Sequence, residues 1–228
     1  MAKTLIRIAV PLRKADDVIP HLGKPEHWRQ GRSAKAVADS WFQANNVPPR
    51  VKAVLDQAAD LRGAELIDAW LERSTDLEDR RGTASQTDLF AVLGIGEDLA
   101  VMGVEAKVDE SFGDLVTKWL GAGTEGKVDR LEKLCTLFKL QPKDVGGLRY
   151  QLFHRTAAAI YEAHRYRSKK AIMMVQSFCA YATGLDDFLA FFDRIGIKGA
   201  GRDVLSSPAW FGGVELRAGW ANDVCPLP

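Results

Sequence analysis

The sequence contains few cysteines, three among 228 residues, and they stand far apart in the chain. Cys135, Cys179 and Cys225 form no C-x-x-C pair, and no histidine lies at zinc-finger spacing from them. This excludes a disulfide framework and a cysteine-based zinc finger, because both need paired thiols at short spacings. An odd and sparse set of cysteines is typical of a reducing compartment, so we expect a cytoplasmic protein.

Long hydrophobic runs are also lacking. The longest early run, residues 5–10, is interrupted by Arg7 and ends before Pro11. A signal-peptide core needs about 7–15 continuous apolar residues, and a membrane span needs about 20. We therefore expect neither a leader nor a membrane span, and no membrane partner.

Neither sign of charge is in excess, because 31 Lys and Arg residues against 30 Asp and Glu residues give a net charge of +1. This excludes a uniformly basic surface of the kind that binds nucleic acid non-specifically. By position, however, acids gather over residues 68–79 and 109–114, and bases gather over 24–35 and 149–170. Such basic groups either contact phosphates or lie on solvated helix faces.

Two familiar catalytic signatures are absent from the sequence. It contains neither the G-x-S-x-G nucleophile elbow nor the H-E-x-x-H zinc motif. This removes the sequence signals for an α/β-hydrolase and for the common zinc metalloproteases.

What is present is an ordinary globular composition, with 46% hydrophobic and 27% charged residues. We expect one domain over residues 1–228, with an N-terminal extension (1–49), a core (about 50–178) and a C-terminal helix and strand (179–228). Strands are predicted over residues 3–12, 87–94, 99–108 and 171–178, with an edge strand over 214–220. Helices are predicted from Ser33 and over residues 50–71, 111–121, about 128–138, 148–166 and 186–195, and a loop over 11–31. This order predicts a mixed α/β (α+β) fold with a central mixed sheet flanked by helices.

The hairpin over 87–108 carries the most informative residues. If Gly94 pairs with Leu99, Asp88 lies directly opposite Glu105, and Lys107 shares their face. Like charges directly opposite one another destabilise a sheet, so this pair needs compensation. A divalent cation would supply it, because Mg²⁺ takes one or two carboxylates, and so would a simple ion pair with Lys107. A slip of one residue in the register would separate the two acids.

These residues carry a resemblance. Thr87-Asp88, followed after a strand-length gap by Glu105-Ala106-Lys107, resembles the D…E-x-K signature of the PD-(D/E)XK nuclease superfamily, with Thr87 in place of the proline. The expected order of helix, hairpin, helix and strand over about 50–178 also resembles that restriction-endonuclease-like core. The stretches around Asp88, Glu105 and 148–156, with the 27–35 region, are similar to a bacterial family without an established activity.

The resemblance implies a Mg²⁺- or Mn²⁺-dependent phosphodiesterase that acts on DNA or RNA. Asp88 and Glu105 would hold the metal with the Ala106 carbonyl, and Lys107 would position the attacking water. For Lys107, an ion pair with Glu105 is the equally weighted reading. The alternative function is a non-catalytic binding or regulatory protein that retains the fold, since fold does not fix function.

Other candidate residues come from the flanking helices. Glu65 continues the apolar spacing of the helix predicted over 50–71 and would add a metal ligand, with Glu72 and Asp68 as fallback choices. On the helix over 148–166, Gln151, His154 and Arg155 are candidate substrate-binding residues. Arg155 stands where related nucleases often carry tyrosine. An exposed edge strand over 214–220 would suit a homodimer.

Overall fold

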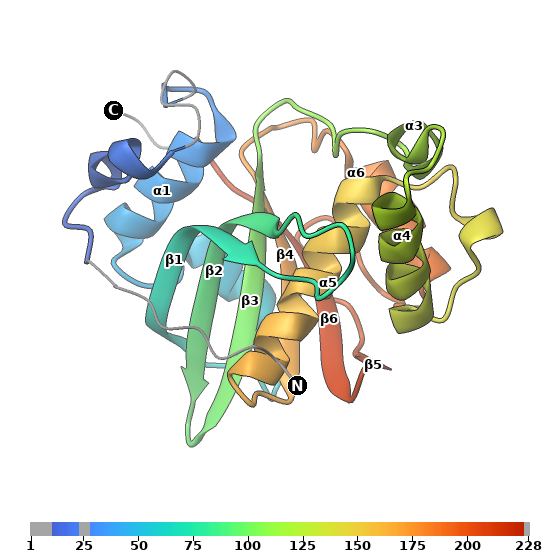
Figure 1. Ribbon diagram of the computed structural model, residues 1–228. Coiled ribbons are helices and arrows are strands. Elements are labelled where there is room, and N and C mark those ends of the chain that lie inside the picture. Colours follow the sequence, from blue (N-terminus) through green and yellow to red (C-terminus); the bar gives the residue numbers. More distant parts are fainter. Residues whose placement is uncertain (1–10, 23–27, 226–228) are drawn as a thin grey trace.

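The computed structural model describes residues 11–22 and 28–225 (Figure 1). The strand predicted over residues 3–12 lies outside the described residues up to residue 10. The chain forms a mixed sheet flanked by helices, as the sequence predicts. No helix among the described residues is long and apolar enough to cross a bilayer.

Six strands form the sheet in the order β1-β2-β3-β4-β6-β5. The first three form an antiparallel meander, β3, β4 and β6 run parallel, and β5 returns antiparallel to β6. The strands are β1 (Glu65–Thr75), β2 (Ser85–Ile95), β3 (Asp98–Lys107), β4 (Lys170–Ser177), β5 (Ala209–Phe211) and β6 (Val214–Asn222).

Helices cover both faces of the sheet, because strand side chains alternate between two apolar clusters. Phe90 and Val92 pack with α4, α5 and α6, whereas Leu89, Ala91 and Leu93 pack with α1 and α2. Figure 1 shows α5 lying across the sheet. The helices are η1 (Ala15–His21), α1 (Ser33–Ala44), α2 (Pro49–Leu55), α3 (Val116–Leu120), α4 (Glu125–Leu137), η3 (Pro142–Asp144), α5 (Tyr150–Arg165) and α6 (Leu185–Arg194).

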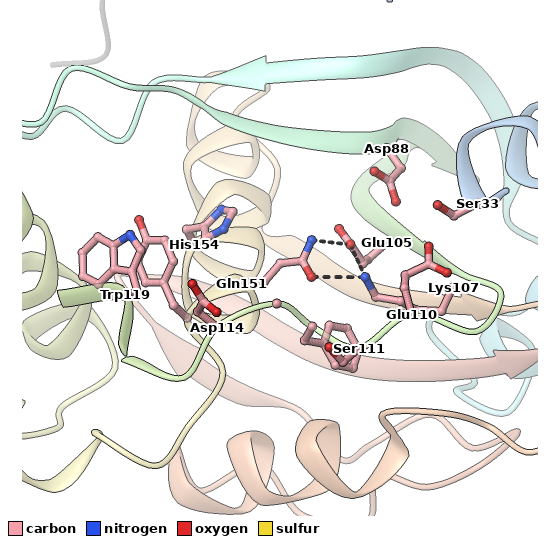
Figure 2. Close-up of a pocket in the computed structure, with 13 residues that line it drawn as sticks. Ser33, Asp88, Glu105, Lys107, Glu110, Ser111, Asp114, Trp119, Gln151 and His154 are labelled. Carbon is pink, nitrogen blue, oxygen red and sulfur yellow. Dashed lines mark hydrogen bonds and ion pairs between the residues drawn. The ribbon is translucent and has the colours of Figure 1, made fainter. Parts of the chain in front are cut away.

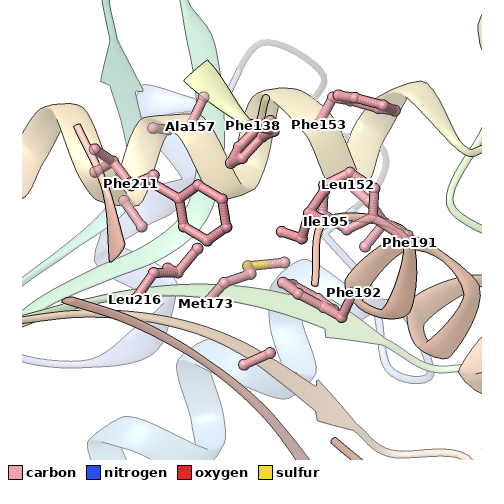
Figure 3. Close-up of a cluster of buried hydrophobic side chains, with 14 of the residues drawn as sticks. Phe138, Leu152, Phe153, Ala157, Met173, Phe191, Phe192, Ile195, Phe211 and Leu216 are labelled. Atoms are coloured by element: carbon pink, nitrogen blue, oxygen red, sulfur yellow. The ribbon is translucent and has the colours of Figure 1, made fainter. Parts of the chain in front are cut away.

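The larger cluster is rich in aromatic rings. Phe138 and Phe153 each pack edge-on against Phe191, with ring centroids 5.8 and 4.8 Å apart (Figure 3). Edge-to-face ring pairs add to the stabilisation from burial alone. They fix α4, α5 and α6 against one another, and so fix the height and rotation of α5 above the sheet.

The helix predicted over 50–71 is wrong in its second half. α2 ends at Leu55, and the edge strand β1 begins at Glu65. Between them the chain turns back, with Gly63 at a positive φ of 78° and its N–H donating to Asp56 Oδ1 at 2.9 Å. Apolar residues at helical spacing before this turn do not continue a helix after it, because pairing with β2 decides the conformation.

The edge strand predicted over 214–220 is also wrong, because β6 is paired on both sides. β4 borders it along its length, and β5 pairs with its start through Phe211 and Val214. Further along, Leu205 bridges to Gly219, and the Ser206 N–H donates to the Ala218 carbonyl. The argument for a homodimer through this strand therefore has no structural basis.

Three smaller expectations also need correction. The loop predicted over 11–31 contains the 3-10 helix η1, and the helix predicted from Ser111 begins only at Val116. Its predicted end at Gly121 is confirmed. In α4, the helical spacing of Val128, Leu131, Leu134 and Cys135 predicts one buried stripe; the last three are buried, but Val128 is 39% exposed.

Gly184, at the start of α6, is expected to be intolerant of a side chain. Its φ is 90°, and a Cβ atom there would lie 2.9 Å from the buried ring of Phe112. Gly184→Ala should lower the free energy of unfolding by about 2–4 kcal/mol in urea denaturation, since backbone strain and overpacking add. Gly196→Ala is the matched control, with φ of 84° but open space, and should cost only about 1 kcal/mol. Equal costs for the two variants would contradict the steric argument.

Candidate functional site

The register of the hairpin brings the two predicted acids together. Gly94 pairs with Leu99 as expected, and the ladder runs as far as Leu89 and Val104, which places Asp88 and Glu105 one residue beyond its last pair on their two strands. The Ala106 N–H donates to Asp88 Oδ2 at 2.8 Å, which ties the two strands together at this point. Ile95 and Asp98 are themselves paired, so the turn between the two strands consists of Gly96 and Glu97.

Asp88, Glu105 and Lys107 share the face of the sheet that α5 covers. Their neighbours Leu89, Val104 and Ala106 belong to the apolar cluster on the other face. From α5, Gln151 and Arg155 reach down to the same carboxylate. The structure thus brings two of the candidate substrate-binding residues of α5 into contact with the hairpin.

Glu105 is the centre of this polar cluster and is only 1% exposed. Its Oε1 accepts hydrogen bonds from Lys107 Nζ at 2.8 Å and Gln151 Nε2 at 2.6 Å, and its Oε2 accepts one from Arg155 Nε at 2.6 Å. Burial alone would raise the pKa of Glu105, but the charges of Arg155 and Lys107 outweigh it and lower that pKa. Glu105 is therefore a buried, ionised carboxylate with two cationic partners.

Asp88 differs sharply from Glu105 in its ionisation. Burial, and then the charge of Glu105 across the ladder, raise the pKa of Asp88 to about 8, against the weaker opposing effects of Arg155 and Lys107. At neutral pH and without a bound cation, the Asp88 carboxyl therefore holds a proton. Paired carboxylates whose pKa values are pushed apart are characteristic of functional sites.

These groups line a pocket of about 440 Å³ between the hairpin, the segment after β3 and the first turns of α5 (Figure 2). Four carboxyl groups and one lysine belong to its lining, so a cation is favoured there over a bare phosphate. The pocket is lined by Ser33, Asp88, Glu105, Lys107, Glu110, Ser111, Phe112, Gly113, Asp114, Trp119, Tyr150, Gln151 and His154.

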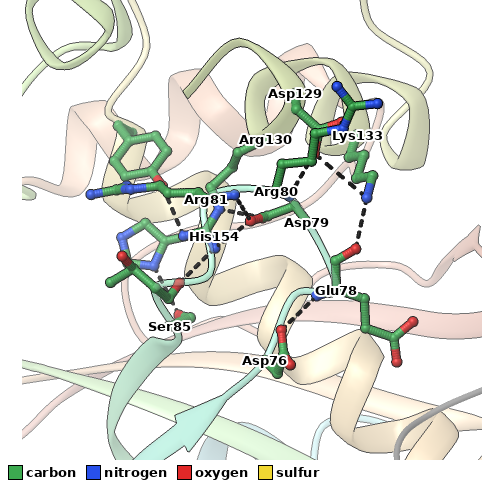
Figure 4. Close-up of polar contacts among 12 residues, drawn as sticks. Asp76, Glu78, Asp79, Arg80, Arg81, Ser85, Asp129, Arg130, Lys133 and His154 are labelled. Carbon is green, nitrogen blue, oxygen red and sulfur yellow. Dashed lines mark hydrogen bonds and ion pairs between the residues drawn. The ribbon is translucent and has the colours of Figure 1, made fainter. Parts of the chain in front are cut away.

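His154 lines the pocket as a neutral ring of fixed tautomer. Arg155 Nη1, which can only donate, lies 3.4 Å from His154 Nδ1 and 3.2 Å from Ser85 Oγ, and Ser85 Oγ itself lies 2.8 Å from the same ring nitrogen (Figure 4). This leaves the hydrogen of His154 on Nε2. Burial, and then the charge of Arg155, lower the pKa of His154 well below its usual value. His154 is thus a neutral hydrogen-bond donor.

Ser85 and the cations behind His154 were missed by the sequence analysis. Arg130 pairs with Asp79, and Arg81 Nη1 donates to the Tyr150 hydroxyl at 3.0 Å, beside the histidine (Figure 4). Arg81 and Asp79 lie in the polar loop between β1 and β2, which has no periodicity from which a contact with α5 can be inferred.

Glu65 does not join the site. It is exposed and pairs with Gly94, at the opposite end of β2 from Asp88. The fallback residue Glu72 is much nearer, because it lies on β1 between the pairs Leu71–Leu89 and Arg73–Thr87, across from Asp88. Glu72 accepts a hydrogen bond from Gln86 Nε2 at 2.6 Å, and burial raises its pKa, with a further contribution from Glu105.

Within residues 11–22 and 28–225, no three acidic, histidine or cysteine side chains converge closely enough to chelate a metal ion. The opposed carboxyl groups of Asp88 and Glu105 still provide the oxygen ligands that Mg²⁺ takes from proteins, one or two carboxylates with the remaining positions left to water or phosphate. The residues therefore fit a divalent cation that is held mainly by two carboxylates.

The basic groups noted in the sequence are largely paired. Arg149 contacts Asp187 at 3.0 Å, Arg165 contacts Glu162 at 3.0 Å, and Lys170 contacts Asp60 at 3.6 Å. In the earlier group, Lys35 contacts Asp39 at 3.1 Å, while residues 24 and 27 lie outside the described residues. Ion pairing on helix and strand surfaces therefore accounts for much of this charge.

A glycine pattern lies outside the pocket, between α3 and α4. Gly121, Gly123 and Gly126 have the spacing G-x-G-x-x-G, which sequence analysis did not register. In dinucleotide-binding folds this spacing joins a strand to a helix, but here it joins α3 to α4. The Lys127 ammonium that follows donates to the Trp119 carbonyl. These glycines serve a turn between two helices.

Comparison with known proteins gives one match. Residues 11–225 match a family described as Domain of unknown function (DUF6946). No curated protein and no solved structure matches the chain.

Proposed function

The chain belongs to this family of unknown function, and on the geometry of the hairpin we propose that it is a divalent-cation-dependent phosphodiesterase acting on nucleic acid. The single observation that carries the proposal is that Asp88 and Glu105, from adjacent strands, line one open pocket, with Lys107 Nζ bonded to the Glu105 carboxylate. The order of hairpin, α5 and β4 is the one that the resemblance to PD-(D/E)XK nucleases implies, whereas β1 stands where the end of the preceding helix was expected.

In this proposal each residue has a separate task. Asp88 and Glu105 would hold the cation, and a bound Mg²⁺ or Mn²⁺ would polarise the phosphodiester and acidify a water molecule. Lys107 Nζ, kept in place by Glu105 and by Gln151 Oε1 at 3.1 Å, stabilises charge on the phosphate oxygens. His154 donates its Nε2–H to the substrate. The Lys107 ammonium nitrogen lies over the face of the Phe112 ring, 4.8 Å from its centroid, and the ring covers it on that side.

One observation favours the alternative, a non-catalytic binding or regulatory protein. Both oxygens of Glu105 already accept hydrogen bonds from cationic side chains, so its charge is compensated without a metal ion. A carboxylate satisfied in this way can be purely structural. The two functions differ in whether added divalent cations bind at Asp88 and start a reaction.

The test is cleavage of a panel of single- and double-stranded DNA and RNA with Mg²⁺, with Mn²⁺ and with chelator. We expect cleavage with a divalent cation only, and a loss of at least about 100-fold in Lys107→Met, because the donor to the developing phosphate charge is removed. Lys143→Met, at an exposed lysine of η3, is the control and should retain wild-type cleavage. Absence of cation-dependent cleavage across the panel would favour the non-catalytic alternative.

A further inference from the structure

Arg155 occupies an unusual position for an arginine. It arises from the second turn of α5, is only 9% exposed, and points its guanidinium between α5 and the hairpin. Nε donates to Glu105 Oε2 at 2.6 Å, and Nη1 donates to Ser85 Oγ at 3.2 Å. A buried guanidinium held at two points cannot sample many positions, so its charge is fixed beside the acids of the pocket.

Arg155 belongs to a buried cluster of acidic and basic side chains. Three carboxyl groups, those of Glu105, Asp88 and Glu72, act electrostatically on the guanidinium. Two cations face them, because Lys107 takes the other oxygen of Glu105. Arg155 thus supplies the positive charge that a divalent cation would otherwise supply to Glu105.

We propose that Arg155 is a built-in cation that competes with a divalent metal ion for Glu105, so that the site takes the metal fully only when Arg155 releases Glu105 Oε2. This rests on the proposed function, because it concerns the same metal site. Ser85 Oγ offers the guanidinium a second anchor that survives the release. Arg155 is therefore a positioning residue that acts through Glu105 and keeps divalent affinity low.

A second buried pair shows what a purely structural arginine looks like in this protein. Arg73 forms two hydrogen bonds with Glu162, which also accepts from the Thr75 hydroxyl and from Arg165. That glutamate lies on α5, its cationic partners among the described residues are two arginines, and it does not line the pocket. Glu105 differs on each count. Lys107 and Gln151 already satisfy one of its oxygens at the pocket wall, so Arg155 adds charge to a carboxylate that needs it less.

The test is a titration of the metal-free full chain with Mn²⁺ at constant pH. Electron paramagnetic resonance of the free ion measures how much Mn²⁺ is bound. Arg155→Met should lower the Kd for Mn²⁺ at least about tenfold relative to the wild type, because one positive charge beside the ion is removed. Arg155→Lys retains the charge and should stay within about threefold of the wild type. Arg149→Met removes a nearby charge paired with Asp187 and should also change the Kd by less than about threefold.

The outcomes separate the two proposals. A gain in Arg155→Met that disappears when Asp88→Asn is added supports the competition, since a merely structural arginine would leave affinity unchanged or reduce it. Equal Mn²⁺ affinity in wild type and Arg155→Met, lost in both on adding Asp88→Asn, overturns the competition and leaves the proposed function standing. No Mn²⁺ binding in any variant overturns both. If Arg155→Met fails to fold, Arg155→Gln removes the charge but keeps a donor toward Ser85, and the same criteria apply.

Discussion

Replacing Asp88 with asparagine is expected to abolish cation-dependent cleavage while leaving the metal-free protein at least as stable as the wild type. The wild-type carboxyl has a pKa of about 8 and is therefore already neutral in the folded, metal-free state at pH 7. Asparagine keeps its shape and still offers an oxygen to the Ala106 N–H. It cannot supply the negative charge that a divalent ligand set requires.

The raised pKa of Asp88 also predicts the direction in which the stability of the folded protein changes with pH. The folded pKa lies above the unfolded value of about 4, so the folded state binds the proton more tightly. The stability from that proton is complete below about pH 4 and is lost as the pH rises through about 8. Asp88→Asn lacks this loss. The free energy of unfolding of Asp88→Asn, relative to that of the wild type, should therefore increase as the pH rises.

Urea denaturation in chelator at a series of pH values measures the effect, and cleavage assays on the same samples complete it. Asp98→Asn is the matched control, because Asp98 lies at the other end of β3 with a 74% exposed side chain. It should follow the wild type in both assays. A stability curve for Asp88→Asn that runs parallel to the wild type would contradict the raised pKa. Wild-type cleavage by Asp88→Asn would contradict the proposed metal site.

The hairpin and α5 could be predicted because their patterns are local. The runs on either side of Gly96 alternate between two apolar clusters, and that alternation together with the turn sets the register that pairs Asp88 with Glu105. In α5, Leu152, Ile160 and Ala163 recur at helical spacing, which predicts that they face inward, and all three are fully buried. Where the period of the apolar residues is unambiguous, the face that a neighbouring polar residue occupies follows from it.

The parts that could not be predicted depend on pairing between distant segments. Nothing within residues 56–71 distinguishes a helix from a strand until β2 lies beside it, so Glu65 was given to the wrong element. For the same reason Glu72 reaches the site only through its pairing position and a positive φ of 54°. The sequence locates Arg155 on a helix near the site. Its contact with Glu105 depends on how the aromatic core rotates α5, which has no local signal.

Replacing Glu105 with glutamine is expected to have the largest effect on stability, lowering the free energy of unfolding by about 3–5 kcal/mol. The variant leaves Lys107, 3% exposed, and Arg155, 9% exposed, as buried cations without their shared counter-ion. Urea denaturation measures the loss. Glu132→Gln, on the exposed side of α4, should change stability by less than about 0.5 kcal/mol. A cost as small as that of the control would mean that water reaches the two cations.

Asp88 should reduce the loss of stability in Glu105→Gln. The coupling between Asp88 and Glu105 can therefore be measured in a double-mutant cycle. Burial still raises the pKa of Asp88 once Glu105 is neutral, but the added repulsion from Glu105 disappears, while the attraction of Arg155 and Lys107 remains. We therefore expect Asp88 to ionise more readily and to act as the counter-ion for both cations. Asp88→Asn, harmless alone, should cost about 1–2 kcal/mol more in the Glu105→Gln background, a coupling typical of residues in one charged network. Additive costs in this double-mutant cycle would mean that the two carboxyl groups do not share their cations. A single cation site across the hairpin would then lose its physical basis.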